Sequence, residues 1–354
     1  MTWTFQFHAR KRKRVEYSTR SVDEKSTPWK HRKKTKSKLY FHFSLHNILK
    51  MENPQRWLTI LSLFDWIACW YEALIRAWIK IEKYLASEID EPAMQIAMKN
   101  HPDIIQIWDV KNVKGGGNIN NIDLLIWWSP CQWFSRAWKM LNFNDPRSKL
   151  FFEFVRIKEE VNPKYFLLEN VKMKKEFQDI ISQYLWVEPI EINSSLVSGQ
   201  NRKRLYWTNI PWVKQPDDKK IFLKDILELD PGSQRIVHDS PIAQIVEWKC
   251  VVKQATKKWF IVADEWDWIC LAFPQSKTRR WRVIKWKSST LMTSNSSCVF
   301  INWNIRKLTP VECERLQNLP DNYTEWISET QRFKTLWNGW TVDVLSHIFK
   351  NIQF

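Results

Sequence analysis

Short hydrophobic runs alternate with amphipathic stretches from residue 57 to about residue 215. The hydrophobic runs are rich in β-branched and aromatic residues, which favour strands, and they cover residues 58–64, 79–88, 101–110, 121–126, 164–170, 187–197 and 204–210. The amphipathic stretches predict helices over residues 71–77, 149–161 and 174–185. Strands that alternate with helices are typical of βαβ units. We therefore expect an α/β, Rossmann-like fold with a mostly parallel, doubly wound sheet.

This alternation ends near residue 215. Residues 216–305 are rich in lysine, serine and tryptophan and contain only short strand candidates, which predicts a small, irregular second domain with some β structure. Helical patterns return over residues 309–319 and 341–352. The pattern thus predicts a large domain over residues 51–215, to which the final segment, residues 306–354, returns.

The net charge of +17 is concentrated at the amino terminus. Residues 1–50 hold fourteen Lys and Arg against three Asp and Glu, a net +11, which leaves +6 for residues 51–354. This basic extension is either a solvated tail or a segment upstream of a true start at Met51. The charge of this extension is therefore not evidence for nucleic-acid binding.

Membrane segments and metal-binding motifs are not expected. No hydrophobic run reaches the roughly 18 residues that span a bilayer, and the first residues lack the apolar core of a secretory signal. The six cysteines form no CxxC pair and show no metal-ligand spacing. These patterns predict a reduced, cytoplasmic protein without a bound metal.

A cysteine and a glutamate follow two strand candidates. Cys131, preceded by the rigid Pro130, comes shortly after the strand at 121–126, and Glu169 ends the strand at 164–170. Neighbouring parallel strands end at one edge of a sheet, so both side chains are expected to face one pocket. Taken singly, Cys131 is more simply a buried structural thiol and Glu169 a surface carboxylate.

Gln200, Arg202 and Arg204 alternate at the start of another strand candidate, so they share one face. Arginines on one face can grip a phosphate or a base edge with two hydrogen bonds. The simpler reading of this segment alone is a solvated run of charge.

The order of the sequence blocks carries a family resemblance. From about residue 57 to its end, the chain resembles the cytosine-5 DNA methyltransferases through the blocks SLFDWIACW, SEID, WDV, DLLIWWSPCQWFSRAWK, LLENV, QNRKRLYW, RKLTPVECERLQNLPDNYT and LWNGWTVDV. The sequences of these blocks are most similar to those of the branch that contains bacterial, phage and eukaryotic de novo enzymes. The resemblance implies a class I methyltransferase fold, S-adenosylmethionine as methyl donor and double-stranded DNA as substrate. It also implies a target-recognition role for residues 216–305, a monomer on DNA, and a bacterial or phage-infected host.

The resemblance also implies a mechanism. Cys131 would attack carbon 6 of a cytosine flipped out of the duplex, while Glu169, hydrogen-bonded at ring nitrogen 3, stabilises the charge that develops. Carbon 5 then takes the methyl group, loses its proton, and Cys131 leaves. Arg202 and Arg204 would hold the flipped base and its backbone. Three further residues are expected to contact DNA: Gln132, Ser135 and Gln200.

The expected cofactor residues lie at strand ends. Phe64 would stack on or line the adenine site, Glu88 would bind the ribose hydroxyls, and Asp109 would bond the adenine amine. The final block would close the methionine end. The full set comprises Phe64, Asp65, Trp66, Ile67, Ala68, Trp70, Glu88, Ile89, Asp109, Val110, Pro130, Asn338, Gly339 and Trp340.

The tryptophans are the anomaly of this sequence, with 24 Trp against only 6 Gly. Nine stand where the family pattern has glycine, namely Trp66, Trp70, Trp78, Trp108, Trp127, Trp128, Trp133, Trp138 and Trp337. Five more are expected to do so: Trp186, Trp266, Trp268, Trp303 and Trp326. This placement argues against an aromatic-stacking, single-strand-binding protein, which would also be rich in tryptophan.

Glycine is needed where the backbone turns with positive φ or approaches a ligand closely, and a bulky residue there costs about 1–3 kcal/mol per site. The summed cost of nine such sites exceeds the free energy of unfolding of about 5–15 kcal/mol that a domain has. We therefore hypothesise that these codons are UGA, read as glycine by some bacterial lineages and their phages, while Trp207 and Trp340 are genuine. We call the product of the gene with UGA read as glycine the glycine-corrected chain. The chain as printed is expected to bind cofactor weakly and to have little or no activity.

Two alternatives remain open at this stage. The same cysteine and glutamate serve in a related enzyme that methylates cytosine in transfer RNA, although the roughly 90-residue insertion favours DNA. A non-catalytic nucleic-acid-binding relative would be expected to lack Cys131 or Glu169, and both are present.

Overall fold

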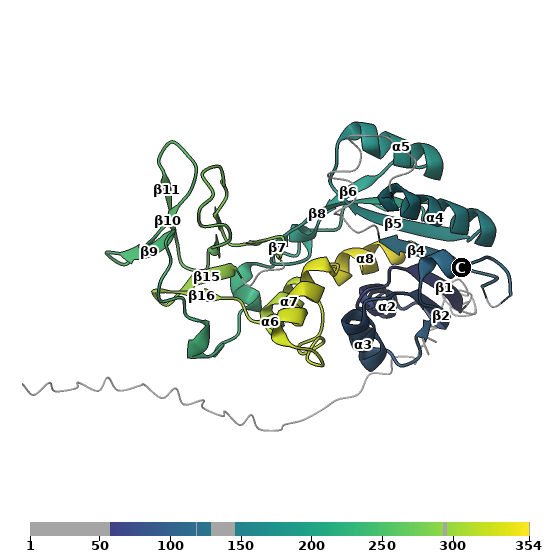
Figure 1. Cartoon of the computed structure of the whole chain (residues 1–354), viewed down its shortest axis with the longest axis horizontal. Coiled ribbons are helices and arrows are strands. Elements are labelled where there is room, and N and C mark those ends of the chain that lie inside the picture. Colours follow the sequence, from purple (N-terminus) through teal and green to yellow (C-terminus); the bar gives the residue numbers. More distant parts are fainter. Residues whose placement is uncertain (1–56, 118, 129–145, 293–295, 354) are drawn as a thin grey trace, which may run out of the picture. The chain divides into compact units, whose positions relative to one another are not determined.

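A seven-stranded sheet forms the centre of the computed structural model, which describes residues 57–117, 119–128, 146–292 and 296–353. Its strand order is β3-β2-β1-β4-β5-β8-β6 (Figure 1). The strands are β1 (Leu58–Leu63), β2 (Ile81–Ser87), β3 (Ile105–Gln106), β4 (Leu124–Trp128), β5 (Tyr165–Val171), β6 (Ile190–Asn193) and β8 (Lys203–Thr208). Strands β1 to β5 pair in parallel, and β8 runs antiparallel to both β5 and β6.

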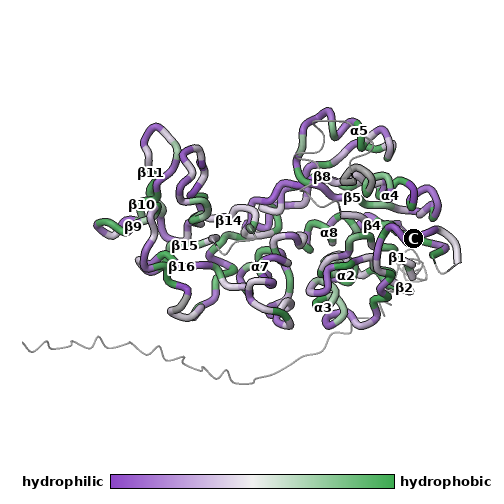
Figure 2. The backbone as a smooth tube through the Cα atoms, viewed as in Figure 1, coloured by the Kyte–Doolittle hydropathy of each residue, from purple (hydrophilic) through white to green (hydrophobic). Residues whose placement is uncertain are grey.

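Helices cover both faces of this sheet because its strands are apolar on both sides. Along β4, Leu124 and Ile126 belong to one core cluster, whereas Leu125 and Trp127 belong to the other. The first cluster receives α2 (Cys69–Arg76), α3 (Glu91–Asn100) and α8 (Val342–Phe349), and the second receives α4 (Pro146–Val161) and α5 (Lys175–Leu185). Helix α8, largely hydrophobic in Figure 2, packs against α2. The predicted doubly wound α/β class is confirmed.

Two helices were not predicted. The first, α3, begins at Asp90, whose side chain accepts a hydrogen bond from the Ala93 amide at 3.2 Å, and it has a proline in its first turn. The second, α7 (Glu329–Asn338), lies between α6 (Pro310–Leu316) and α8. The strand expected over residues 101–110 shortens to β3, because it is an edge strand that pairs only with β2.

The segment between the main sheet and α6 forms smaller sheets. Strands β9 (Ala243–Val246), β10 (Lys249–Lys253) and β11 (Phe260–Ala263) make one antiparallel sheet, and β12 (Trp268–Cys270), β13 (Val283–Ile284), β15 (Ser297–Ile301) and β16 (Asn304–Lys307) make another. The two sheets share one hydrophobic cluster. Strand β14 (Ser288–Ser289) instead pairs in parallel with β7 (Gln200–Asn201), directly before β8. Among the described residues, no helix has the length and apolar character to cross a membrane.

Candidate active site

Glu169 lies beside the strand that leads to Cys131. It is the fifth residue of β5, and its partner in the parallel register is Trp128, the last residue of β4. Cys131 follows Trp128 by three positions but, like Pro130, Gln132 and Ser135, lies outside the described residues. The structure therefore places Glu169 beside the carboxyl end of β4, as expected from the sequence, while the pocket that Cys131 and Glu169 are expected to share stays a prediction.

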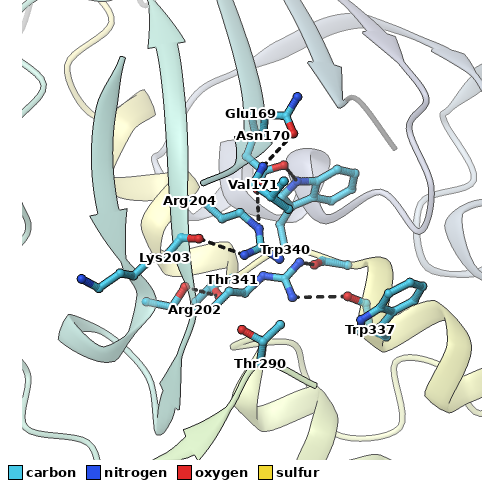
Figure 3. Close-up of polar contacts among 12 residues, drawn as sticks. Glu169, Asn170, Val171, Arg202, Lys203, Arg204, Thr290, Trp337, Trp340 and Thr341 are labelled. Carbon is cyan, nitrogen blue, oxygen red and sulfur yellow. Dashed lines mark hydrogen bonds and ion pairs between the residues drawn. The ribbon is translucent and has the colours of Figure 1, made fainter. Parts of the chain in front are cut away.

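The Glu169 carboxyl is fully buried and has two polar neighbours (Figure 3). The indole Nε1 of Trp340 donates to Glu169 Oε2 at 3.0 Å. Arg204 Nε lies 2.9 Å from Glu169 Oε1 and forms an ion pair with it. Burial raises the pKa of Glu169, and the charges of Arg204 and Arg202 oppose this rise. A carboxyl group poised in this way can hold a proton and donate it to a ring nitrogen.

Trp340 thus holds the Glu169 carboxyl through its indole N–H. In the glycine-corrected chain, Trp340→Phe keeps an aromatic ring but removes the hydrogen bond to Glu169, a loss worth about 1–3 kcal/mol, or roughly tenfold or more in kcat. Because that bond favours the ionised form, the pKa of Glu169 should rise further. The alkaline limb of the kcat–pH profile should then move to higher pH. Trp207→Phe is the control, since Trp207 is equally buried but donates to Ser182 Oγ. Equal profiles for both variants would contradict this role.

The Arg202 side chain donates its described hydrogen bonds to backbone carbonyl groups. Its guanidinium donates to the carbonyls of Trp337 at 3.3 Å and Gly339 at 2.7 Å, and the residue is only 3% exposed (Figure 3). Gln200 is fully buried and its side-chain amide donates to the Leu316 carbonyl at 3.4 Å. The base-holding and DNA-binding roles expected of Arg202 and Gln200 stay predictions.

The turn after β1 has an unusual backbone. Phe64, Trp66 and Ala68 all have φ near 56°, in the left-handed region. Ile67 and Ala68 are buried, and Asp65 Oδ1 accepts a hydrogen bond from the Tyr84 hydroxyl at 2.5 Å. Complete burial raises the pKa of Asp65 to about 7. This is the alternating backbone that a glycine-containing, ligand-binding turn adopts.

Glu88 ties the first turn to the second strand. Its Oε2 accepts from the Trp66 amide at 3.0 Å, and its Oε1 accepts from the amides of Ile89 at 2.7 Å and Asp90 at 2.9 Å. Burial raises the pKa of Glu88, and these amide bonds oppose the rise. The structure thus joins Trp66, Glu88 and Ile89 in one group, as the sequence predicts.

Four other predicted cofactor residues lie near this edge in less constrained positions. Asp109 is half-buried and caps the short turn that follows through a 3.0 Å bond from the Lys111 amide, and Val110 is buried. Asn338 is half-buried at the end of α7, and the buried Gly339 amide donates to the Thr335 carbonyl at 2.9 Å.

Indole rings fill the space beside the first turn. The Trp66 ring is 6% exposed, donates to the Thr335 carbonyl at 2.8 Å and lies 6.1 Å from the Trp128 ring. The Trp340 ring lies 5.4 Å from Trp128 and 4.7 Å from Trp70, which is fully buried. Four side chains therefore pack continuously where the sequence places the methionine end of a cofactor. The residues present do not fit S-adenosylmethionine.

Sequence reasoning missed three residues of this site. Tyr84 holds Asp65, Thr335 accepts the Trp66 indole, and Gln317 donates to the carbonyls of Leu336 at 2.8 Å and Gly339 at 3.4 Å. Tyr84 was detectable as an inward position of a predicted strand. Within the described ranges, no group of three His, Cys, Asp or Glu is arranged to hold a metal ion.

Comparisons with known proteins identify the family of this chain. The family model for the C-5 cytosine-specific DNA methylases matches residues 58–184 and 199–354. The Type II methyltransferase M1.ScrFI of Lactococcus lactis subsp. cremoris is 28% identical over 304 residues, which cover 76% of this chain and 71% of that protein. The Type II methyltransferase M.NlaX of Neisseria lactamica is 26% identical over 311 residues, covering 83% and 96%.

A solved structure supports the fold. The chain is similar, with a TM-score of 0.58 and 20% identity, to a DNA modification methyltransferase encoded within a prophage of Escherichia coli, and the match covers 83% of this chain and 98% of the other. At this identity the likeness bears on the fold alone.

Proposed function

Because the chain belongs to the C-5 cytosine-specific DNA methylase family, its gene encodes a DNA cytosine-5 methyltransferase, and we propose that Cys131 and Glu169 carry the reaction. The observation that best supports this proposal is the pairing of Glu169 with Trp128. It brings a buried carboxyl with a raised pKa beside the strand that leads to the only cysteine in the SPCQ block.

The proposed chemistry follows from these two groups. The Cys131 thiolate forms a bond to carbon 6 of cytosine, and the electron pair of the 5,6 double bond moves toward carbon 5 and the ring. Protonated Glu169, hydrogen-bonded to ring nitrogen 3, stabilises the negative charge that develops there. Carbon 5 becomes nucleophilic enough to accept a methyl group. Loss of the carbon 5 proton then lets the carbon–sulfur bond break and returns the thiolate. Methyltransferases of this family generally use S-adenosylmethionine as the donor.

Arg204 is proposed to act beside Glu169 on the base, and Arg202 to act on the other substrate. By holding the carbonyls of Trp337 and Gly339, Arg202 fixes the segment expected to close the methionine end of the donor site. This refines the role suggested by the sequence, which placed both arginines on the flipped base.

The two roles of Arg202 predict different kinetics in the glycine-corrected chain. Arg202→Ala should raise the KM for S-adenosylmethionine about 10- to 100-fold through loss of two charged hydrogen bonds, with little change in the KM for DNA. Lys203→Ala is the matched control, since Lys203 is exposed and pairs at the surface with Glu191. A variant in which only the KM for DNA rises would instead support base holding.

Target recognition is proposed for the small sheets within residues 216–305. Exposed cations that suit phosphate contacts lie at the end of β10 and in the loops of these sheets, namely Lys253, Lys257, Lys258, Lys277 and Arg280. The pairing of β14 with β7 joins this region to the segment that directly precedes β8, the strand that carries Arg204. We further propose a monomer that acts on duplex DNA in the bacterial cytoplasm, within a restriction-modification context like that of its Type II relatives.

A substrate comparison tests the proposed function. The glycine-corrected chain with radiolabelled S-adenosylmethionine should methylate duplex DNA and leave transfer RNA unlabelled, and bisulfite sequencing should find the modified cytosines within one short recurring sequence. Label in transfer RNA but not in DNA would favour the RNA-modifying relative. Label in neither would favour the non-catalytic one.

A further inference from the structure

We infer that glycine is the residue specified by the gene at fourteen tryptophan positions, and that these glycines open the donor site that indoles fill in the printed chain. Two structural signatures single out the positions: a left-handed backbone and a buried indole N–H without a partner. Neither signature uses the family resemblance. Only the statement about the donor site rests on the proposed function.

Eleven tryptophans have a left-handed backbone, with φ between 56° and 64°. They are Trp66, Trp78, Trp108, Trp186, Trp212, Trp248, Trp259, Trp266, Trp281, Trp286 and Trp303. Ten other non-glycine residues in the described ranges have positive φ: five asparagines, which tolerate this region, and Phe64, Ala68, Lys220, Glu247 and Phe273. A bulky side chain has no preference for this region, whereas glycine enters it freely. Five of the eleven, at 212, 248, 259, 281 and 286, were not predicted from the sequence.

The local motifs at these positions specify glycine independently. After α2, the Trp78 amide donates to the Ile75 carbonyl at 2.9 Å and the Ile79 amide to the Leu74 carbonyl at 3.1 Å, the two bonds of a Schellman motif. Trp78 occupies the left-handed position of that motif, where glycine is the usual residue. Trp186, the residue that follows α5, is likewise left-handed with φ of 58°, and its amide donates to the Ser182 carbonyl at 2.8 Å.

Two hairpins show the same feature. Asn302 and Trp303 form the two-residue loop between β15 and β16, with φ of 49° and 60°. Glu247 and Trp248 connect β9 to β10 with φ of 47° and 63°. Positive φ at both positions defines the type I′ turn, whose favoured sequence is Asn-Gly. The Asn302-Trp303 loop becomes this sequence when position 303 is glycine.

The side chains of these tryptophans contribute little to the core. Ten of the eleven are between 41% and 88% exposed, and Trp66 is the exception. Large apolar side chains are more often buried. Ten exposed indoles on left-handed backbone therefore indicate positions where a side chain adds nothing to the packing of the fold.

The second signature marks three buried tryptophans. The Nε1 groups of Trp70, Trp127 and Trp268 are buried and have no hydrogen-bond partner among the described residues. Buried polar groups in proteins are nearly always hydrogen-bonded. Trp207 and Trp340 behave as native residues should, because both are buried and donate to Ser182 Oγ and Glu169 Oε2. The eleven left-handed tryptophans and these three make fourteen, and Trp207 and Trp340 remain tryptophan. Trp128, Trp326 and Trp337, which the sequence also predicts as glycine, carry neither signature, and Trp133 and Trp138 lie outside the described residues, so these five rest on the family resemblance alone.

The consequence for function lies at the first turn. Trp66 and Trp70 are both in the inferred set, and their rings belong to the continuous packing with Trp128 and Trp340. Glycine at 66 and 70 removes two of these four rings while the Trp66 amide bond to Glu88 stays. The left-handed backbone at 66 is then unstrained, and the space beside Glu88 becomes available to a donor molecule.

The codons of the gene test the inference directly. We expect UGA at the fourteen positions and UGG at Trp207 and Trp340, and mass spectrometry of the protein from its natural host should find glycine in the corresponding peptides. UGG at most of the fourteen positions, or UGA at Trp207 or Trp340, would overturn the inference. UGA at the fourteen positions with no DNA methylation would leave it standing and refute the proposed function.

Binding measurements test the statement about the donor site. Three chains are compared by calorimetric titration with S-adenosylmethionine. The first has glycine at all fourteen positions. The second has tryptophan at position 66 and glycine at the other thirteen, and the third has tryptophan at position 281 and glycine at the other thirteen. Overpacking at the first turn should weaken binding about 10- to 100-fold in the chain that keeps Trp66. Trp281 is 79% exposed, so the third chain should bind like the first while unfolding at a lower temperature. Equal affinity of all three chains would show that Trp66 does not obstruct the donor.

Discussion

The glycine-corrected chain with Cys131→Ala is expected to methylate no detectable DNA. The loss should exceed the roughly 10²- to 10⁴-fold that a proton-transfer residue contributes, because carbon 5 stays unreactive until carbon 6 carries a nucleophile. The measurement is incorporation of labelled methyl groups into duplex DNA. A second readout uses DNA with fluorine at carbon 5 of cytosine. Fluorine blocks the proton loss that frees the thiolate, so the parent chain should remain covalently attached to this DNA and the variant should not.

Cys250→Ala is the matched control for this experiment. Cys250 is also a free thiol, fully buried in β10, and burial raises its pKa to about 12, so it is not a nucleophile at neutral pH. The control should keep both activity and the trapped complex. Methylation by Cys131→Ala at the parent rate would refute the covalent mechanism.

Glu169→Gln is expected to lower kcat by about 10²- to 10⁴-fold, with the KM for DNA changed less. Glutamine has the same shape but carries no acidic proton for ring nitrogen 3. Glu191→Gln is the matched control, since Glu191 lies on neighbouring β6 and pairs with Lys172 and Lys203 at the surface. It should retain parent activity. A Glu169→Gln enzyme with unchanged kcat would exclude Glu169 as the acid.

The pH dependence follows from the raised pKa of Glu169. The acid must be protonated to act, so kcat should fall as pH rises through its pKa, while the need for the Cys131 thiolate makes the rate fall toward low pH. Because the folded pKa is raised, the protonated form also favours the folded state. The corresponding stability is present below the ordinary carboxyl pKa and is lost as pH rises through the folded value. Glu169→Gln should remove both effects.

The sheet was largely predictable because its signal is local. Strand β4 is a continuous apolar run and β1 and β5 are mostly apolar, and the adjacency of Glu169 to the end of β4 follows from parallel strands that end at one edge. The helix α3 was missed although Asp90 and the following proline mark its start.

The partners of the site residues were not predictable, because they lie far away in the chain. Trp340 is 171 residues from Glu169, and the Trp337 carbonyl is 135 residues from Arg202. No periodicity in the sequence encodes such a pair. For Trp340, the sequence suggested a cofactor contact, whereas the structure gives it a hydrogen bond to the acid.

The parallel pairing of β14 with β7 has a consequence for how such enzymes exchange specificity by recombination. Ser288 and Ser289 pair with Gln200 and Asn201, and Lys287 Nζ donates to the Ser198 carbonyl at 3.0 Å. A crossover that imports the recognition sheets together with β14 would place a foreign strand against the host's β7, which directly precedes β8 and its Arg204. Lineages that swap this region should therefore inherit the two strands together or retain the host's β14. New specificity in this family is then limited by the need to keep β14 and β7 compatible, as well as by the loops that contact DNA.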